Sequence, residues 1–231
     1  MQLGPRLATA KHLEQNGFAL LPSILPPSAL SSLDLPELTE RGRGGSRCLL
    51  DQPWCADLAR QLLQHPALRD LIPHDHVAVQ CTYFEKSATR NWLVAVHQDL
   101  SIPVATQLEH PELRGWSHKD GSHFVQAPRE VLEQLLAVRV HLDDCGPDDG
   151  PLRVVPATHT QGIIDAHRAV ELRDASGETE CAMERGDALA MRPLLLHASS
   201  KGRGNSRRRV LHFVFGPPAL PFGLRWQVAV R

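Results

Sequence analysis

The chain has 231 residues, of which 42% are hydrophobic and 22% charged, as in a globular protein that buries its own core. Its formal net charge of −1 argues against nucleic acid or an anionic membrane as a partner. No apolar run approaches the roughly 18 residues that a membrane span needs, and the first residues lack the apolar core of a signal peptide. The five cysteines form no C-x-x-C pair, so we expect reduced thiols and a cytoplasmic protein.

Residues 1–70 are expected to be mainly helical. The apolar spacing indicates an amphipathic helix, a short strand and two further helices, in this order: Pro5–Gln15, Phe18–Leu21, Pro27–Leu33 and Asp57–Gln64. Asn16-Gly17, a usual stop signal, ends the first helix. The basic, glycine-rich segment Thr39–Arg47 is interpreted as a solvated connector, with contact to phosphate as the alternative.

From residue 76 onward the apolar pattern changes to the period of two that β-strands show. Six segments have this pattern: His76–Phe84, Trp92–Val96, Val138–Leu142, Leu152–Val155, Ala188–Met191 and Val210–Phe215. Short strands between Gly, Pro and Asp turns predict a closed or two-sheet β architecture, with one helical turn at Glu130–Leu136. Asp148-Asp149-Gly150 is interpreted as a hairpin turn. We therefore predict one domain over residues 1–231, mainly β (α+β), with flanking N-terminal helices.

A histidine and a carboxylate, His97 and Asp99, lie two residues apart at the end of a predicted apolar strand. Residues so spaced on a strand point to the same face, although a plain surface pair is an equally good interpretation of H-x-D alone. A further histidine, His197, follows the predicted strand Ala188–Met191. Two imidazoles and one carboxylate can occupy one face of an octahedral ferrous ion and leave three positions open. The pattern thus suggests an open iron site.

A run of three arginines, Arg207–Arg209, follows His197, and Arg208 is eleven residues beyond that histidine. A guanidinium matches the two oxygens of a carboxylate, so one of these side chains can anchor a dicarboxylate co-substrate. The alternative is a basic strand edge that discourages aggregation. Strand alternation separates Arg208 from its two neighbours, but both faces are plausible interiors. Periodicity alone therefore does not select the arginine.

Four sequence blocks occur in a characteristic order: YFEKSATRNWLVAVHQDLSIPV, then the Trp116 region with VQAPREVLEQLLAVRVHLDDC, then DDGPLRVVPATHTQG, and finally HAS…RRRVLHF. On these blocks the chain resembles the phytanoyl-CoA dioxygenase family of iron(II)- and 2-oxoglutarate-dependent oxygenases, over most of its length. The resemblance implies a double-stranded β-helix, the cupin-like jelly roll, over residues 71–231, with a metal at its open end. Residues 1–70 would form the helical flank.

The resemblance also implies the members of the site. The implied ligands of iron(II) are His97, Asp99 and His197. The implied contacts of 2-oxoglutarate are Arg208, Ser199, Trp116 and Lys86. The reaction would consume dioxygen and 2-oxoglutarate, release succinate and CO2, and hydroxylate a C–H bond of a small-molecule substrate. Because Asp99 is retained, where halogenating relatives carry a small residue, hydroxylation is favoured.

The connection at residues 105–128 is rich in histidine and is interpreted as a possible lid, with a surface loop as the alternative. His141 and His212 are expected to line or support the barrel. Two other functions stay open. A metal-dependent, non-oxidative cupin-type enzyme would need no arginine for 2-oxoglutarate. A catalytically silent binding module would instead dock an anionic partner on its basic segments, and its binding would depend on salt.

Overall fold

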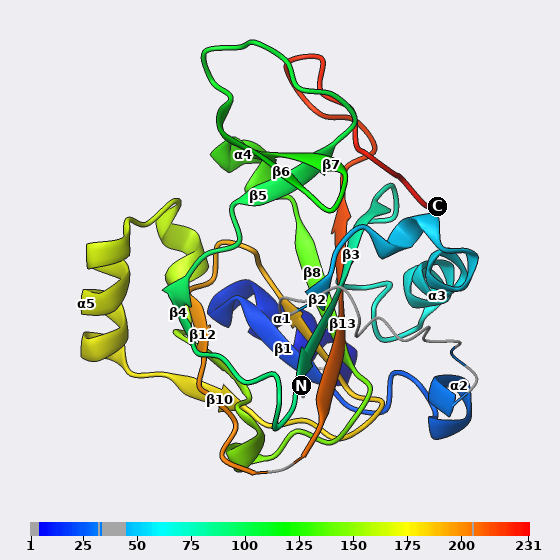
Figure 1. The fold of residues 1–231 in the computed structure, drawn as a ribbon, viewed down its shortest axis with the longest axis vertical. Helices are drawn as coiled ribbons and strands as arrows, with labels where there is room; N and C mark the ends of the chain where they lie inside the picture. The colour runs from blue at the N-terminus through cyan, green and yellow to red at the C-terminus, as the bar shows by residue number, and fades with distance from the viewer. Residues whose placement is uncertain (1–4, 32, 34–44, 205) are drawn as a thin grey trace.

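The computed structural model describes residues 5–31, 33, 45–204 and 206–231, and its named strands form three antiparallel sheets (Figure 1). The largest has the order β1 (Phe18–Leu21), β11 (Ala188–Met191), β8 (Leu136–His141), β13 (Arg208–Gly216), β3 (Val77–Lys86) and β2 (Gly45–Ser46). The second has the order β10 (Thr179–Cys181), β9 (Leu152–Val154), β12 (His197–Ser199) and β4 (Val94–His97). The third has the order β5 (Ser101–Val104), β7 (Ser122–Gln126) and β6 (Arg114–Lys119). The first two sheets make up a jelly roll, so the predicted double-stranded β-helix is confirmed.

β13 lies inside the largest sheet, between β8 and β3, and both of its faces are covered. Leu211 and Phe213 point to one face and belong to the same buried cluster as the apolar side chains of helix α3 (Pro53–Gln64). Arg208 and His212 point to the other face, where they line cavities inside the barrel. Burial on both sides explains why nearly the whole strand is inaccessible to solvent. The face of β13 that carries Arg208 and His212 is therefore the barrel interior, a choice that the alternation of the sequence alone did not make.

Helix α3 covers the outer face of this sheet, as its leucine spacing predicts. It begins at Pro53, four residues before the predicted start at Asp57, because proline suits the first turn of a helix, where no partner for its missing N–H is needed. The side chains buried by the contact are Cys55, Leu58, Ala59 and Leu62. A short helix, α2 (Pro27–Ser31), and a 3-10 turn, η2 (Leu49–Asp51), complete this flank.

Helix α1 (Pro5–Asn16) forms where it is predicted, but the expected amphipathic pattern is wrong. Among its described side chains only Leu13 is buried, whereas Leu7 is exposed. The helix ends at Gly17, which has a φ of +81° and whose N–H bonds the carbonyl of Leu13 at 2.9 Å. A side chain at this position would strain the backbone and would also meet the ring of His159. The stop signal thus works as expected.

The connection at residues 105–128 contains regular structure that the sequence did not indicate. β6 and β7 form a hairpin, and β7 pairs with β5 to make the third sheet. This sheet lies at one end of the molecule beside the C-terminal segment, and a bridge joins Val104 to Trp226 (Figure 1). Its inward side chains share one buried cluster with Trp226. A contact with the far end of the chain therefore gives this segment its structure.

The predicted hairpin at Asp148-Asp149-Gly150 is wrong. The segment forms a turn, η3 (Pro147–Asp149), and Gly150 follows with a φ of +66°. β8 and β9, which flank the turn, belong to different sheets and do not pair. The chain crosses here from one sheet of the jelly roll to the other. Sequence reasoning also missed helix α5 (Ala166–Ser176), whose N-cap Asp165 accepts two backbone N–H bonds.

One sequence expectation, the basic connector, lies partly outside the described chain. Of the predicted basic connector Thr39–Arg47, residues 39–44 lie outside the described residues. The remaining part includes β2, which pairs with β3. The helical turn predicted at Glu130–Leu136 is present only in its first part, as α4 (Arg129–Leu132), because Leu136 already begins β8. Across the described ranges, every helix falls short of the length and apolarity that crossing a membrane requires.

The register of β1 and β11 offers a matched stability test. Leu20 and Leu189 are directly opposite each other, but Leu189 is fully buried whereas Leu20 is 45% exposed. We expect Leu189→Ala to lower the free energy of unfolding by about 2–5 kcal/mol, since it leaves a cavity in the core. Leu20→Ala should change it by less than about 1 kcal/mol. Urea denaturation of both variants checks the difference, and equal losses would contradict the burial of this sheet.

Candidate metal centre

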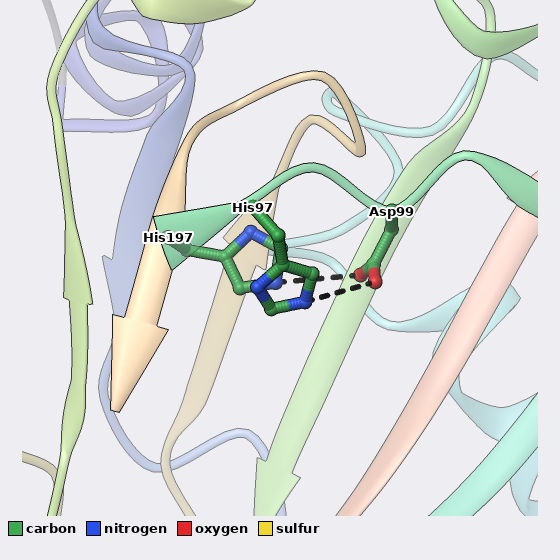
Figure 2. A group of neighbouring side chains, drawn as sticks. All are labelled: His97, Asp99 and His197. Carbon is green, nitrogen blue, oxygen red and sulfur yellow. Dashed lines mark ion pairs between the residues drawn. The ribbon is translucent and has the colours of Figure 1, made fainter. Parts of the chain in front are cut away.

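The pairing of β12 with β4 brings the two distant histidines together. His197 is directly opposite His97 in this antiparallel register, and their ring centroids are 4.3 Å apart. Asp99 follows the end of β4 by two residues, and its backbone N–H is bonded to the carbonyl of Pro193. One Asp99 carboxylate oxygen lies 3.8 Å from His97 Nε2, and the other lies 3.7 Å from His197 Nε2 (Figure 2). One ligand atom from each of the three side chains lies within 4.8 Å of the other two.

The orientation of each imidazole is fixed by a carbonyl two residues earlier in the chain. His97 Nδ1 lies 2.8 Å from the carbonyl of Ala95, and His197 Nδ1 lies 2.9 Å from the carbonyl of Leu195. A carbonyl only accepts, so Nδ1 carries the proton of each neutral ring and Nε2 presents its lone pair. Both Nε2 atoms face Asp99. This is the arrangement in which outer hydrogen bonds prepare histidines to bind a metal.

Gln98 lies between the candidate ligands His97 and Asp99 in the sequence, and its side chain forms hydrogen bonds to two loops. Its Nε2 donates to the carbonyls of Gly162 and Leu194 at 2.8 and 2.7 Å, and its Oε1 accepts from the N–H of Ile164 at 2.8 Å. The amide is buried and uses both of its ends. These hydrogen bonds fix the position of Gln98 and therefore stabilise the backbone of His97 and Asp99 on either side of it.

The protonation states of the group also suit a metal. Burial lowers the pKa of His197 to about 4, although Asp99 acts in the opposite direction, so the imidazole is neutral near pH 7. Enclosure raises the pKa of Asp99, but the neighbouring histidines outweigh it and the net pKa is below the ordinary value. Neutral imidazole and ionised carboxylate are the forms that bind metal ions. Two nitrogens and one carboxylate on one side are the donor set of open ferrous sites, so the residues present fit iron(II).

The three arginines of the predicted run have different surroundings. Arg207 makes two hydrogen bonds to Glu85, at 2.9 and 3.2 Å. Arg209 makes two to Asp143, at 2.8 and 2.6 Å. Arg208 alone points into the barrel, where its Nη1 donates to the carbonyl of Gly150 and, among the described residues, its buried Nε has no partner. Arg208 is therefore the arginine that remains available to a ligand.

Arg208 shares a small cavity, of about 90 Å³, with the three candidate ligands. Lys86 is opposite Arg208 in the β13–β3 register, and its Nζ donates to Ser199 Oγ at 2.8 Å and to the carbonyl of Ser200. Burial and the nearby Arg208 lower the pKa of Lys86 to about 7. Three of the side chains expected to contact the co-substrate, Arg208, Ser199 and Lys86, thus lie together beside the metal ligands.

The structure does not bring Trp116 to this site. Trp116 lies on β6 and packs, partly buried, against the apolar cluster that contains Ile102, Val125 and Trp226. It does not line either of the two cavities at the metal ligands. The reason is the fold of residues 105–128, which makes a separate sheet and carries Trp116 away from the barrel interior.

A larger cavity, of about 300 Å³, is also lined by His97 and Asp99. Its polar lining includes Gln80, Thr82 and His212, and two cations, Arg47 and Lys119, also border it. Sequence reasoning missed Gln80 and Thr82. The signal that points to them is a polar residue at positions 80, 82 and 86 of one face of β3, interrupted by Phe84. Polar side chains on one face of a buried strand mark a lined cavity rather than a packed core.

Comparison with known proteins agrees with this geometry. A jelly roll that gathers two histidines and a carboxylate beside a buried arginine defines the class of non-haem iron oxygenases that use 2-oxoglutarate. The sequence profile of the phytanoyl-CoA dioxygenase (PhyH) family matches residues 38–210. The chain belongs to this family. The predicted enzyme class and the predicted cofactors, iron(II) and 2-oxoglutarate, are thereby confirmed. No curated protein matches the chain in sequence.

Three solved structures illustrate the likeness of the fold. EvdMO1 has a TM-score of 0.67 and 18% identity, with 93% of this chain covered but only 50% of EvdMO1. SnoK, a non-haem α-ketoglutarate-dependent carbocyclase from nogalamycin biosynthesis, has a TM-score of 0.65 and 14% identity, with coverages of 96% and 89%. HygX from Streptomyces hygroscopicus, with nickel and 2-oxoglutarate bound, has a TM-score of 0.63 and 17% identity, with coverages of 94% and 88%. This chain thus spans about half of EvdMO1 and most of the other two.

The pKa of Lys86 predicts a pH dependence of stability. Lys86 is close to neutral in the folded protein but charged in the unfolded chain up to an ordinary pKa of 10.5. The unfolded state therefore binds more protons between about pH 7 and 10, and the free energy of unfolding should rise with pH in that window. Relative to Lys86→Met, the wild type should gain up to about 1.4 kcal/mol per pH unit. Urea denaturation at pH 7, 8 and 9 measures this, with the exposed Lys11→Met as control. A parallel pH profile for wild type and Lys86→Met would exclude a depressed pKa.

Proposed function

We propose that this protein hydroxylates a C–H bond of a small-molecule substrate, with iron(II) held by His97, Asp99 and His197. The observation that carries the proposal is the convergence of these three side chains beside the inward-pointing Arg208. Iron(II) with 2-oxoglutarate and dioxygen supplies the oxidising power, and succinate and CO2 are released. The protein contributes the positions of the reactants around the metal.

Arg208 and Ser199 are proposed to hold the far carboxylate of 2-oxoglutarate. Arg208 has an unpartnered Nε in a cavity that also contains the metal ligands, and a guanidinium can bind both oxygens of a carboxylate. Lys86 donates to Ser199 Oγ, so the Ser199 hydroxyl hydrogen points away from Lys86 and can be donated to the co-substrate. With a pKa near 7, Lys86 can accept a proton when a dianion arrives and so offset its charge.

The larger cavity is proposed to bind the substrate. It shares His97 and Asp99 with the smaller cavity but is not lined by Arg208, so a substrate there can reach the metal without occupying the place of the co-substrate. Its volume of about 300 Å³ suits a small molecule rather than a macromolecule. HygX, which has the same fold, has been solved with hygromycin B bound. Lys119 and Phe124 reach the cavity from β6 and β7, which supports the proposal that residues 105–128 cover it.

The proposed iron ligands can be tested on His97. Its side chain is 41% exposed, so removal should not compromise folding. We expect His97→Ala to lose succinate formation by more than about 100-fold, since loss of a ligand should exceed the cost of losing an outer partner. The weak visible band formed anaerobically with iron(II) and 2-oxoglutarate should also disappear. Aerobic incubation of the wild type with a metabolite library, scored by succinate release and by a mass gain of one oxygen, tests hydroxylation itself.

A matched control is His167→Ala, because His167 lies on the exposed surface of α5 and should change neither signal. If the wild type forms no band with iron(II) and 2-oxoglutarate, the proposed centre is excluded. If succinate is formed but no product gains an oxygen, the centre stands and hydroxylation is replaced by another oxidative outcome, of which the ring closure by SnoK is one example.

The proposed role of Arg208 can be tested with Arg208→Lys. The substitution keeps the charge but loses the two-pronged geometry, which should cost about 1.5–3 kcal/mol of co-substrate binding. This corresponds to a roughly 10- to 100-fold higher KM for 2-oxoglutarate. Titration of the visible band with 2-oxoglutarate measures it without a known substrate.

Arg207→Lys is the neighbouring control, since Arg207 is paired with Glu85 on the other face of the strand. It should leave the titration unchanged. An effect of Arg207→Lys, with none from Arg208→Lys, would move the co-substrate to the opposite face of β13.

A further inference from the structure

A second arginine, Arg139, is buried in the barrel and takes no part in the function proposed above. It lies on β8, is 6% exposed and lines the smaller cavity. Within the described part of the chain no carboxylate lies within 4 Å of its guanidinium, and its buried Nε has no partner. Its one hydrogen bond runs from Nη1 to His212 Nδ1, at 2.9 Å. The guanidinium also lies over the Phe84 ring, 5.4 Å from its centroid, but a buried guanidinium without a carboxylate partner is costly, which argues that it has a function.

The contact between Arg139 and His212 determines where the ring proton of His212 lies. A guanidinium has donors and no acceptor, so His212 Nδ1 must be the acceptor. The neutral ring then carries its proton on Nε2. This tautomer is the opposite of that in His97 and His197, whose Nδ1 atoms face carbonyls.

The Nε2–H of His212 faces the carboxylate of Asp99. His212 Nε2 lies 3.8 Å from Asp99 Oδ2, the same oxygen that is 3.7 Å from His197 Nε2. Hydrogen bonds at such sites are commonly long before the reactants bind and shorten afterwards. Asp99 has no side-chain hydrogen bond to its own strand among the described contacts, unlike the two histidines. His212 Nε2–H is therefore a hydrogen-bond donor beside the Asp99 carboxylate, which has no donor from its own strand among the described contacts.

We propose that Arg139 and His212 position the carboxylate of Asp99 for the metal. Arg139 sets the tautomer of His212, and His212 donates from Nε2 to Asp99. Both are positioning residues, and the inference rests on the proposed metal centre. Loss of such an outer partner typically weakens metal binding by about 10- to 100-fold.

The first test measures the dissociation constant of Co²⁺, followed by its visible absorption in the absence of oxygen. His212→Leu should weaken binding by about 10- to 100-fold. His212→Gln should restore it to within about threefold of wild type, because one amide can accept from Arg139 and donate to Asp99. The control is His141→Leu, since His141 is equally buried, lies two residues from Arg139 and touches none of the ligands. Melting temperatures of the three variants separate a folding defect from a loss of positioning.

The second test needs no metal. The ¹⁵N shifts of the His212 ring, assigned by their loss in His212→Gln, should show protonation at Nε2 in the wild type. Arg139→Met, which keeps much of the volume and removes the donor, should yield a mixture of tautomers and weaker Co²⁺ binding. Combined with His212→Leu it should add no further loss, since both variants remove one chain of contacts.

The outcomes separate this inference from the function on which it rests. If the wild type binds no Co²⁺, or if His97→Ala binds it as well as wild type, the metal centre itself is excluded. If His97→Ala loses Co²⁺ but His212→Leu keeps wild-type affinity, only the positioning role is overturned. A ring protonated at Nδ1, or at both nitrogens, would also overturn it.

Discussion

Everything in the site depends on the pairing of β12 with β4, a contact between two very short strands. It sets His197 directly opposite His97, although 99 residues of chain lie between them. Side chains in such opposite positions are close enough to share an ion. The pairing alone would be weak, but β9 continues the sheet on the other side of β12 and Gln98 fastens β4 to two loops. The β9 pairing and the Gln98 hydrogen bonds together stabilise the position of His197 opposite His97.

The barrel interior combines this geometry with an unusual set of charges. Alternate positions of β3, β8 and β13 place basic side chains inside, including Lys86, Arg139 and Arg208, around the carboxylate of Asp99. Burial keeps His197 and His212 neutral and brings Lys86 close to neutrality. The interior is therefore prepared for anions and for a divalent cation together, which is what a dicarboxylate bound beside iron(II) requires.

The sequence predicted those parts of the fold and site that short-range patterns encode. The spacing of His97 and Asp99, the strand that precedes them and the stop at Gly17 all depend on neighbours within a few residues. Among Arg207, Arg208 and Arg209, only the family resemblance selected Arg208 as the residue that binds 2-oxoglutarate. The alternation of the strand could not, because the answer depends on which face of the strand the second sheet covers. Trp116 was expected at the co-substrate, but a contact of its segment with Trp226 gives that segment its own sheet. Long-range contacts of this kind leave no local signal.

The three candidate ligands differ in how their orientation is secured, and this has a consequence for the evolution of the fold. Each histidine is oriented by a carbonyl two residues earlier in the chain, so its geometry is encoded locally. The carboxylate depends on distant parts of the chain. Replacement of the carboxylate would therefore leave in place the two carbonyl bonds that orient the imidazoles. In evolutionary terms, a substitution of Asp99 would therefore perturb the other two ligands of the centre least.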